Sequence, residues 1–224
     1  MRNLIAFVVA ISSAIAASSP SEFHLAYGGK GEMSVSFTLD SSLPQTCTYG
    51  LNSGPQSSSA STVVKSYIGG TFHHATMVSL EAGKKYSYSC AGGPTFDFLA
   101  PPPAGDLTWG GFATFGDWGY LGSKERGPSL PVGGLQLNWS AVPVRELLET
   151  WKNDGNMSFI LHTGDIVYAD DGFGEHPLEF TYENVTTGWF SWIQNLSASF
   201  PLVPHGANPE SQREAGLVIC WYIK

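Results

Sequence analysis

Short runs of alternating apolar and polar side chains fill most of the first hundred residues. Residues 33–39 read Met-Ser-Val-Ser-Phe-Thr-Leu, and residues 47–50 and 85–90 show the same period of two. Strict alternation places the apolar side chains on one face of a strand, so each run predicts a half-buried β-strand. Clusters of Gly, Ser, Pro and Asn between the runs predict turns. Residues 20–100 are therefore expected to form an all-β sandwich of two packed sheets.

The pattern changes after a Pro-rich linker at residues 101–105. Two continuous apolar runs, 109–115 and 157–162, are typical of buried strands. Four apolar residues between them recur at helical spacing, namely Val144, Leu147, Leu148 and Trp151. A second helical face is formed by Trp189, Trp192, Ile193 and Leu196. Strand, helix and strand make a βαβ unit, so residues 106–224 predict an α/β part whose two strands are parallel.

Each of the two predicted parallel strands is followed by a Gly-Asp pair. Asp117 follows the first strand, Asp165 follows the second, and Tyr168 comes three residues after Asp165. Parallel neighbours end at the same edge of a sheet, where α/β folds bind ligands. Two carboxylates held close together share a proton or bind a cation, and a phenolate favours a hard, highly charged metal. The alternative interpretation is ordinary turn chemistry after a strand.

These two motifs carry a resemblance to a known family. Residues 116–119 (Gly-Asp-Trp-Gly) fit GDxG, and residues 164–168 (Gly-Asp-Ile-Val-Tyr) fit GDxxY. In this order they resemble the first two metal-binding motifs of the purple acid phosphatases, which are calcineurin-like metallophosphoesterases. The resemblance implies that Asp117 and Tyr168 bind Fe(III) and that Asp165 bridges it to a divalent metal (Zn, Fe or Mn). It also implies that a small phosphate ester is the substrate.

The resemblance further implies the fold and the reaction. The fold is a fibronectin type III-like β-sandwich followed by an α/β metallophosphoesterase domain. The reaction is the hydrolysis of phosphate monoesters at acidic pH. The order of strand-like runs and turns in residues 20–100 is similar to the family's N-terminal domain.

The resemblance weakens after residue 204. The family continues with GNH, where this chain has Gly-Ala-Asn-Pro-Glu at 206–210, and its later VxxH and GHxH motifs are not found in the 224 residues. We therefore expect a C-terminally truncated, incomplete phosphoesterase domain that is weakly active or inactive, unless His162, His176 or His205 completes the site. Half a sheet should also leave an unpaired edge and uncovered apolar surface. The alternative function is that of a secreted, non-catalytic β-sandwich binding protein.

Composition and the N-terminus indicate export. Arg2 precedes an apolar run at 4–15 and a small-residue cleavage site, so residues 1–17 are expected to be a signal peptide of a secreted protein, extracellular or in the cell wall. No other run is long enough to predict a membrane span. The formal net charge of −8 argues against nucleic acid as a partner. Four glycosylation sequons follow, at Asn138, Asn156, Asn184 and Asn195. The sequence predicts no oligomeric state.

Two further groups of residues invite a chemical interpretation. Of the three cysteines, Cys47 and Cys90 lie in strand-like runs and are the likelier disulfide pair, with two buried thiols as the alternative. His73 and His74 are adjacent in a predicted strand. Adjacent side chains on a strand point to opposite faces, so we expect these histidines to be strand residues rather than ligands of one ion.

Overall fold

The fold was analysed in a computed structural model of the 224-residue chain. The residues that the structure describes are 18–67, 70–106, 110–116, 118–119, 129–132, 135–138, 142–155, 157–164, 166–167 and 182–204. The expected signal peptide and the predicted metal ligands Asp117, Asp165 and Tyr168 lie outside these ranges. Within them, no helix is both long and apolar enough to cross a membrane.

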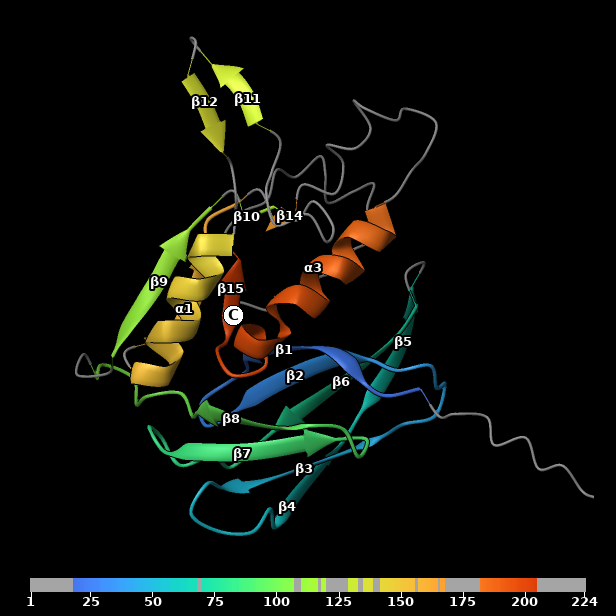
Figure 1. The fold of residues 1–224 in the computed structure, drawn as a ribbon. Coiled ribbons are helices and arrows are strands. Elements are labelled where there is room, and N and C mark those ends of the chain that lie inside the picture. The colour runs from blue at the N-terminus through green and yellow to red at the C-terminus, as the bar shows by residue number, and fades with distance from the viewer. Residues whose placement is uncertain are drawn as a thin grey trace, which may run out of the picture.

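The first part of the chain is a sandwich of two four-stranded antiparallel sheets (Figure 1). The first sheet has the order β1 (Ser21–Tyr27), β2 (Met33–Thr38), β6 (Gly70–Met77) and β5 (Val63–Tyr67). The second has the order β4 (Ser58–Ser61), β3 (Thr46–Leu51), β7 (Lys85–Cys90) and β8 (Thr95–Leu99). The predicted two-sheet sandwich is confirmed.

Alternating burial along the strands builds the core of the sandwich. Every second residue of β2 is fully buried, as its sequence pattern predicts. Phe23 of β1 stacks on Phe37 of β2 with ring centroids 5.0 Å apart, and it also packs on Tyr88 of the other sheet. The same core therefore joins both sheets, and burial of its aromatic side chains is the main source of their cohesion.

The two cysteines of the sandwich form a disulfide. Cys47 of β3 and Cys90 of β7 lie directly opposite each other in the antiparallel ladder, with Cα atoms 3.9 Å apart. Both side chains are fully buried. The expected pairing is confirmed, and it ties together the two central strands of the second sheet.

The two adjacent histidines are strand residues, as predicted. His73 of β6 is fully buried, bonds to the Ser41 carbonyl oxygen and the Thr62 hydroxyl, and stacks on Phe37. His74 points to the other face and bonds to the Ser36 hydroxyl at 2.7 Å. Their opposite orientations exclude chelation of one ion by this pair.

The second part contains a three-stranded parallel sheet covered by two helices. Its strands have the order β15 (Leu202–Pro204), β13 (Met157–His162) and β9 (Gly111–Phe115). Helix α1 (Val142–Asp154) connects β9 to β13, so the predicted βαβ unit and its parallel strands are confirmed. Helix α3 (Tyr182–Ser197) precedes β15. It buries Trp189, Ile193 and Leu196 on the face that their spacing predicts.

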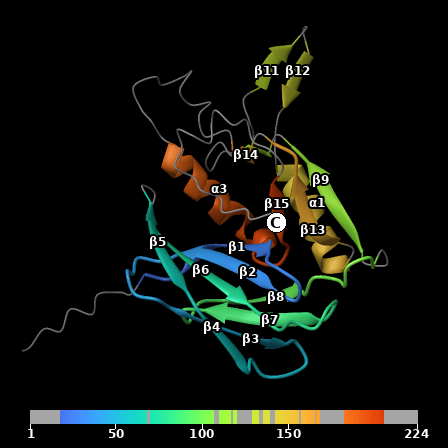
Figure 2. The same ribbon diagram turned by 180° about the vertical axis from the view of Figure 1, so that it is seen from behind.

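Two small sheets continue from this domain. Strands β10 (Trp118–Gly119) and β14 (Ile166–Val167) form a short parallel pair beyond the ends of β9 and β13. Strands β11 (Ser129–Val132) and β12 (Leu135–Asn138) form a hairpin, which lies at the end of the molecule far from the sandwich (Figure 2).

The C-terminal end of α3 is docked on the β-sandwich. Figure 1 shows the end of this helix lying against β1. Three hydrogen bonds cross the contact: Tyr88 Oη to Ala198 O (2.9 Å), Ser197 Oγ to Phe23 O (2.7 Å) and Phe23 N to Gln194 Oε1 (3.2 Å). The His24 and Phe190 rings stack beside them at 4.9 Å. The two parts of the chain therefore share a bonded, partly aromatic interface.

Candidate metal centre

The ends of β9 and β13 touch where the two Gly-Asp motifs begin. The Thr163 amide donates a hydrogen bond of 2.8 Å to the Phe115 carbonyl, which extends the parallel ladder beyond both strands. A Cβ atom added at Gly116 would lie 3.1 Å from Thr163 Oγ1 and 3.4 Å from the Gly164 carbonyl oxygen. Glycine at position 116 thus allows this backbone to lie close to Thr163 and Gly164, where a larger side chain would be crowded.

The chain resumes its parallel pairing immediately after each predicted aspartate. Trp118 pairs with Ile166, and Gly119 pairs with Val167. The described residues on both sides of positions 117 and 165 are therefore neighbours across two strands. Gly164, just before position 165, has a φ of +131°, which strongly favours glycine. This arrangement supports the expected meeting of the two motifs at one sheet edge.

The three predicted ligands themselves are not placed. Asp117, Asp165 and Tyr168 all lie outside the described residues, and so do His176 and His205. In the described ranges, no three His, Cys, Asp or Glu side chains form a group that could hold a metal ion. The ligand assignment therefore stays a prediction, framed by the described residues on each side.

A cluster of buried rings lies beneath the strand ends. Trp118, His162 and Trp189 are at most 1% exposed, and each pair of their rings is separated by 5.6–6.3 Å between centroids. The Trp189 indole N–H donates to the Trp118 carbonyl oxygen at 2.7 Å. Helix α3 thereby holds the backbone of the residue that follows Asp117.

His162 belongs to this ring cluster, where it also meets the edge of the Phe115 ring at 5.5 Å. From the sequence, His162 is expected only as an unassigned ligand, and Trp118 has no expected role beyond the motif. The signal for their packing was present, since both are large rings at the carboxyl ends of predicted strands. Their mutual contact depends on α3, which their local sequences do not specify.

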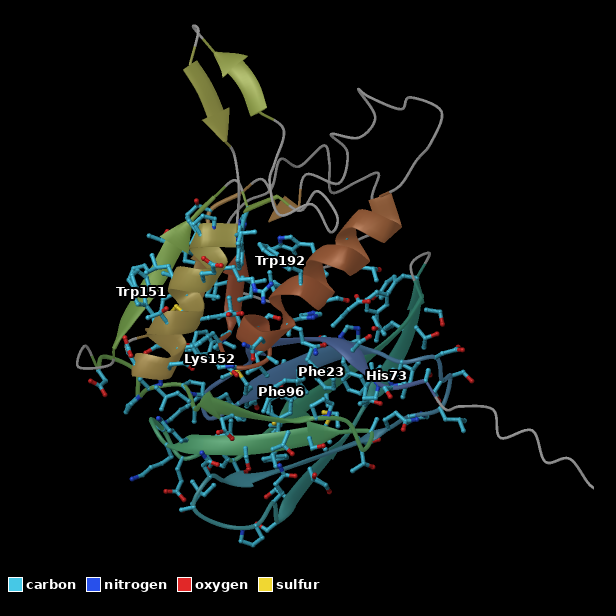
Figure 3. The ribbon with its side chains drawn as sticks, in the orientation of Figure 1. Phe23, His73, Phe96, Trp151, Lys152 and Trp192 are labelled. Atoms are coloured by element: carbon cyan, nitrogen blue, oxygen red, sulfur yellow. A yellow bond between two sulfur atoms is a disulfide. The ribbon has the colours of Figure 1, made fainter. Side chains whose placement is uncertain are left out.

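Helix α1 is joined to the same cluster through Trp192. The Trp192 ring lies 5.8 Å from the Trp118 ring, and the Arg145 guanidinium lies 5.2 Å from the Trp192 centroid. Figure 3 shows Trp192 between α1 and α3. Arg145 is also paired with Glu149 one helical turn later at 3.0 Å. Aromatic contacts thus connect both helices to the strand ends that carry the motifs.

The fold is thus a β-sandwich followed by an α/β part in which the ends of two parallel strands lie close together. Comparison with known proteins agrees with this fold. Residues 20–99 match the family model for the purple acid phosphatase N-terminal domain. Purple acid phosphatase 22 of Arabidopsis thaliana is 29% identical over 170 residues, which cover 70% of this chain and 34% of the relative. Purple acid phosphatase 18 of the same plant is 35% identical over 112 residues, 47% of this chain and 25% of the relative.

A solved structure supports the same arrangement. The purple acid phosphatase from yellow lupin (Lupinus luteus) seeds superposes with a TM-score of 0.62 at 14% identity, over 85% of this chain and 35% of that protein. At this identity the match bears on the fold alone. These comparisons confirm the resemblance of the chain to the purple acid phosphatases, and residues 20–99 carry the match to the family's N-terminal domain. The chain spans about a third of the length of the first of these relatives.

Proposed function

We propose that this chain contributes the first metal-binding half of a phosphatase site that hydrolyses phosphate monoesters at a dinuclear metal centre. The observation that supports this most is the close approach of Gly116 to the Thr163 hydroxyl and the Gly164 backbone, with parallel pairing resumed at Trp118 and Ile166. Two carboxylates at positions 117 and 165 would then leave neighbouring strands at the same level. Such a pair would repel strongly without a cation between them.

The donor set fits the metals that the family resemblance implies. Asp117 and Tyr168 would hold Fe(III), and Asp165 would be shared with a divalent ion, because carboxylate and phenolate oxygens are hard donors. When bound, the two ions would polarise the phosphate and lower the pKa of a water molecule. Other residues of this chain would position the strand ends that carry these ligands. The glycines allow the close approach of the strand ends, and the buried Trp189 holds the Trp118 backbone through the hydrogen bond from its indole N–H.

No observation favours the alternative of a non-catalytic binding protein. That function would need an exposed aromatic patch on the sandwich. In the described part of the sandwich, the exposed large hydrophobic side chains are Leu43, Val63 and Val78, and none of these is aromatic.

A chimera tests the proposed function. Residues 20–204 of this chain would replace the matching segment of Arabidopsis purple acid phosphatase 22, and hydrolysis of a chromogenic phosphate ester would be measured at acidic pH. We expect turnover that falls by about 10²-fold or more in Asp165→Asn, as for loss of one preorganised electrostatic contact. Asp97→Asn is the matched control, because Asp97 is exposed on β8 of the sandwich.

Two outcomes would contradict the proposal. One is a folded, iron-loaded chimera without activity, and the other is full activity in its Asp165→Asn variant. The 224-residue chain by itself should show little turnover, unchanged by Asp165→Asn. Its predicted ligands would give three donors to one ion and only Asp165 to the other, whereas two-metal hydrolysis needs both ions.

A further inference from the structure

An apolar groove runs along the outer side of the α/β part, between α1 and the edge strand β9. It has a volume of about 370 Å³ and is lined by the β9 residues 112–115 and by Val144, Leu147, Leu148 and Trp151 of α1. Leu147 is 48% exposed and Trp151 is 37% exposed. Figure 3 shows Trp151 on the side of α1 that faces β9. The predicted α1 face is therefore only half covered, since Leu148 alone of these α1 residues is buried.

The edge strand β9 has two features that would accommodate a further strand. β9 pairs with β13 on one side, and no strand in the described ranges pairs with its other side. Its side chains also alternate, because Ala113 is buried under the helices whereas Phe112 is 47% exposed on the opposite face of the sheet. Phe112 stacks flat on Phe159 of β13 with centroids 4.9 Å apart. A strand added at this edge would thus meet apolar side chains on both of its faces.

The chain contains a segment with the composition that such a position requires. Residues 217–223 read Leu-Val-Ile-Cys-Trp-Tyr-Ile, without a charge, a proline or a glycine. β-branched and aromatic residues dominate this run, and a continuous apolar run is typical of a strand that is buried on both faces. Polar residues precede it at 210–214, and Lys224 follows it. The segment lies outside the described residues.

The segment is also within reach of the groove. β15 ends at Pro204 and is separated from β9 by β13 alone. A strand on the outer side of β9 would lie three strand spacings from β15, which amount to about 14 Å. Residues 205–216 extend to about 40 Å when fully stretched, which is enough to cross the end of the sheet. The chain would then arrive at the carboxyl end of β9 and run back along it in the antiparallel direction.

We propose that residues 217–223 dock on the outer edge of β9 as an antiparallel fourth strand. One row of their side chains would fill the groove beside Leu147 and Trp151, and the other would cover Phe112. Burial would remove an apolar patch of the kind that promotes edge-to-edge aggregation. The proposal does not depend on the phosphatase site.

The single remaining cysteine makes this proposal testable. Cys47 and Cys90 are already bonded to each other, so Cys220, at the centre of the segment, is the thiol left for a cross-link. Thr114→Cys places a partner thiol on the face of β9 away from the helices, and Leu147→Cys places one on the helix side. One of the two variants can therefore reach Cys220 whichever face of the added strand its side chain occupies. Asn153→Cys is the matched control, because Asn153 is exposed and half a helical turn away from the face of α1 that lines the groove.

Each variant of the full chain would be placed in a glutathione redox buffer, and disulfides would be identified by peptide mass spectrometry. We expect a Cys220 disulfide within one chain for Thr114→Cys or Leu147→Cys, formed about tenfold faster than for Asn153→Cys because docking raises the local thiol concentration. Rates equal to the control in both variants would overturn the proposal. A cross-link between two chains would overturn it as well, since a second copy would then occupy the edge.

Discussion

Two titratable residues of β1, Glu22 and His24, have pKa values shifted in opposite directions. Glu22 is 6% exposed, and burial raises the pKa of its carboxyl to about 7, although a hydrogen bond with Thr38 offsets part of the shift. Burial lowers the pKa of His24 to about 4, against the opposing effect of its bond to the Glu22 carbonyl. Both side chains are therefore held in their neutral forms at mildly acidic pH.

These shifts predict opposite dependences of stability on pH. A carboxyl whose pKa is raised on folding stabilises the fold fully below its unfolded pKa, and this contribution is lost as the pH rises through the folded pKa. For Glu22 the loss falls between pH 4.5 and about 7. For His24 the contribution is present above pH 6.5 and is lost as the pH falls towards about 4.

Glu22→Gln should remove the first dependence. We expect its free energy of unfolding, relative to that of the unmodified protein, to rise by up to about 3 kcal/mol between pH 4.5 and 7. Urea denaturation at several pH values measures this difference. His24→Gln serves as the internal control, because its relative stability should instead rise as the pH falls from 6.5. A Glu22→Gln difference that is constant across this range would show that Glu22 is ionised in the folded protein.

At the scale of elements, α3 joins the two parts of the molecule. Its buried face packs on the parallel sheet, and its C-terminal end bonds to β1 and β7. The irregular pairing of β1 between Ser21 and His24 leaves the Phe23 amide to donate to Gln194 of the helix. A local break in one sheet thus supplies a hydrogen bond across the contact.

Removal of one bond across this contact should weaken the α/β part selectively. Tyr88→Phe deletes the buried hydroxyl that donates to Ala198 O and leaves that carbonyl without this donor, at a cost of about 1–3 kcal/mol. Tryptophan fluorescence is the appropriate probe, because all seven tryptophans follow residue 106. Tyr49→Phe is the matched control, since its hydroxyl bonds to Val78 within the sandwich. If the unfolding transition followed by tryptophan fluorescence shifts equally in Tyr88→Phe and Tyr49→Phe, the result would contradict a role of Tyr88 in docking.

Periodicity predicted the elements better than their ends or their contacts. The runs at 33–39 and 157–162 became β2 and β13 almost unchanged, because alternation and continuous apolar character are local properties of the chain. Helix α1 starts at Val142, before the first residue of its apolar stripe, with Pro143 suited to the first turn. Helix α3 includes Thr186, Thr187 and Gly188, which are weak helix formers held by tertiary packing.

The candidate site also has one feature that the sequence predicted and one that it did not. The βαβ pattern predicted that the strands that precede Asp117 and Asp165 would end side by side at one edge of a parallel sheet, and the structure places Gly116 close to the Gly164 backbone. The cluster of Trp118, His162 and Trp189 was not predicted, because α3 brings the third ring from a distant part of the sequence. Contacts of this kind depend on the docking of elements, which no local pattern encodes.

At the scale of the whole molecule, one hydrophobic core fills the sandwich and a second lies between the parallel sheet and its helices. Helix α3 and the residues after it touch both, and Ala198 packs in the core of the sandwich. The motif-bearing strand ends lie at the far end of β9 and β13 from this contact (Figure 2). The sandwich therefore contacts one end of the α/β part, and the proposed metal site lies at the opposite end of the α/β part.

The most direct test of the proposed metal centre is the colour of the iron-loaded protein. Visible absorption would be measured after Fe(III) is added to the chimera that carries residues 20–204, alongside its Tyr168→Phe and Tyr67→Phe variants. Coordination of iron by the Tyr168 phenolate predicts a visible band that Tyr168→Phe abolishes and Tyr67→Phe retains. A band that persists unchanged in Tyr168→Phe would mean that Tyr168 is not an iron ligand, and it would contradict the assignment of the second Gly-Asp motif.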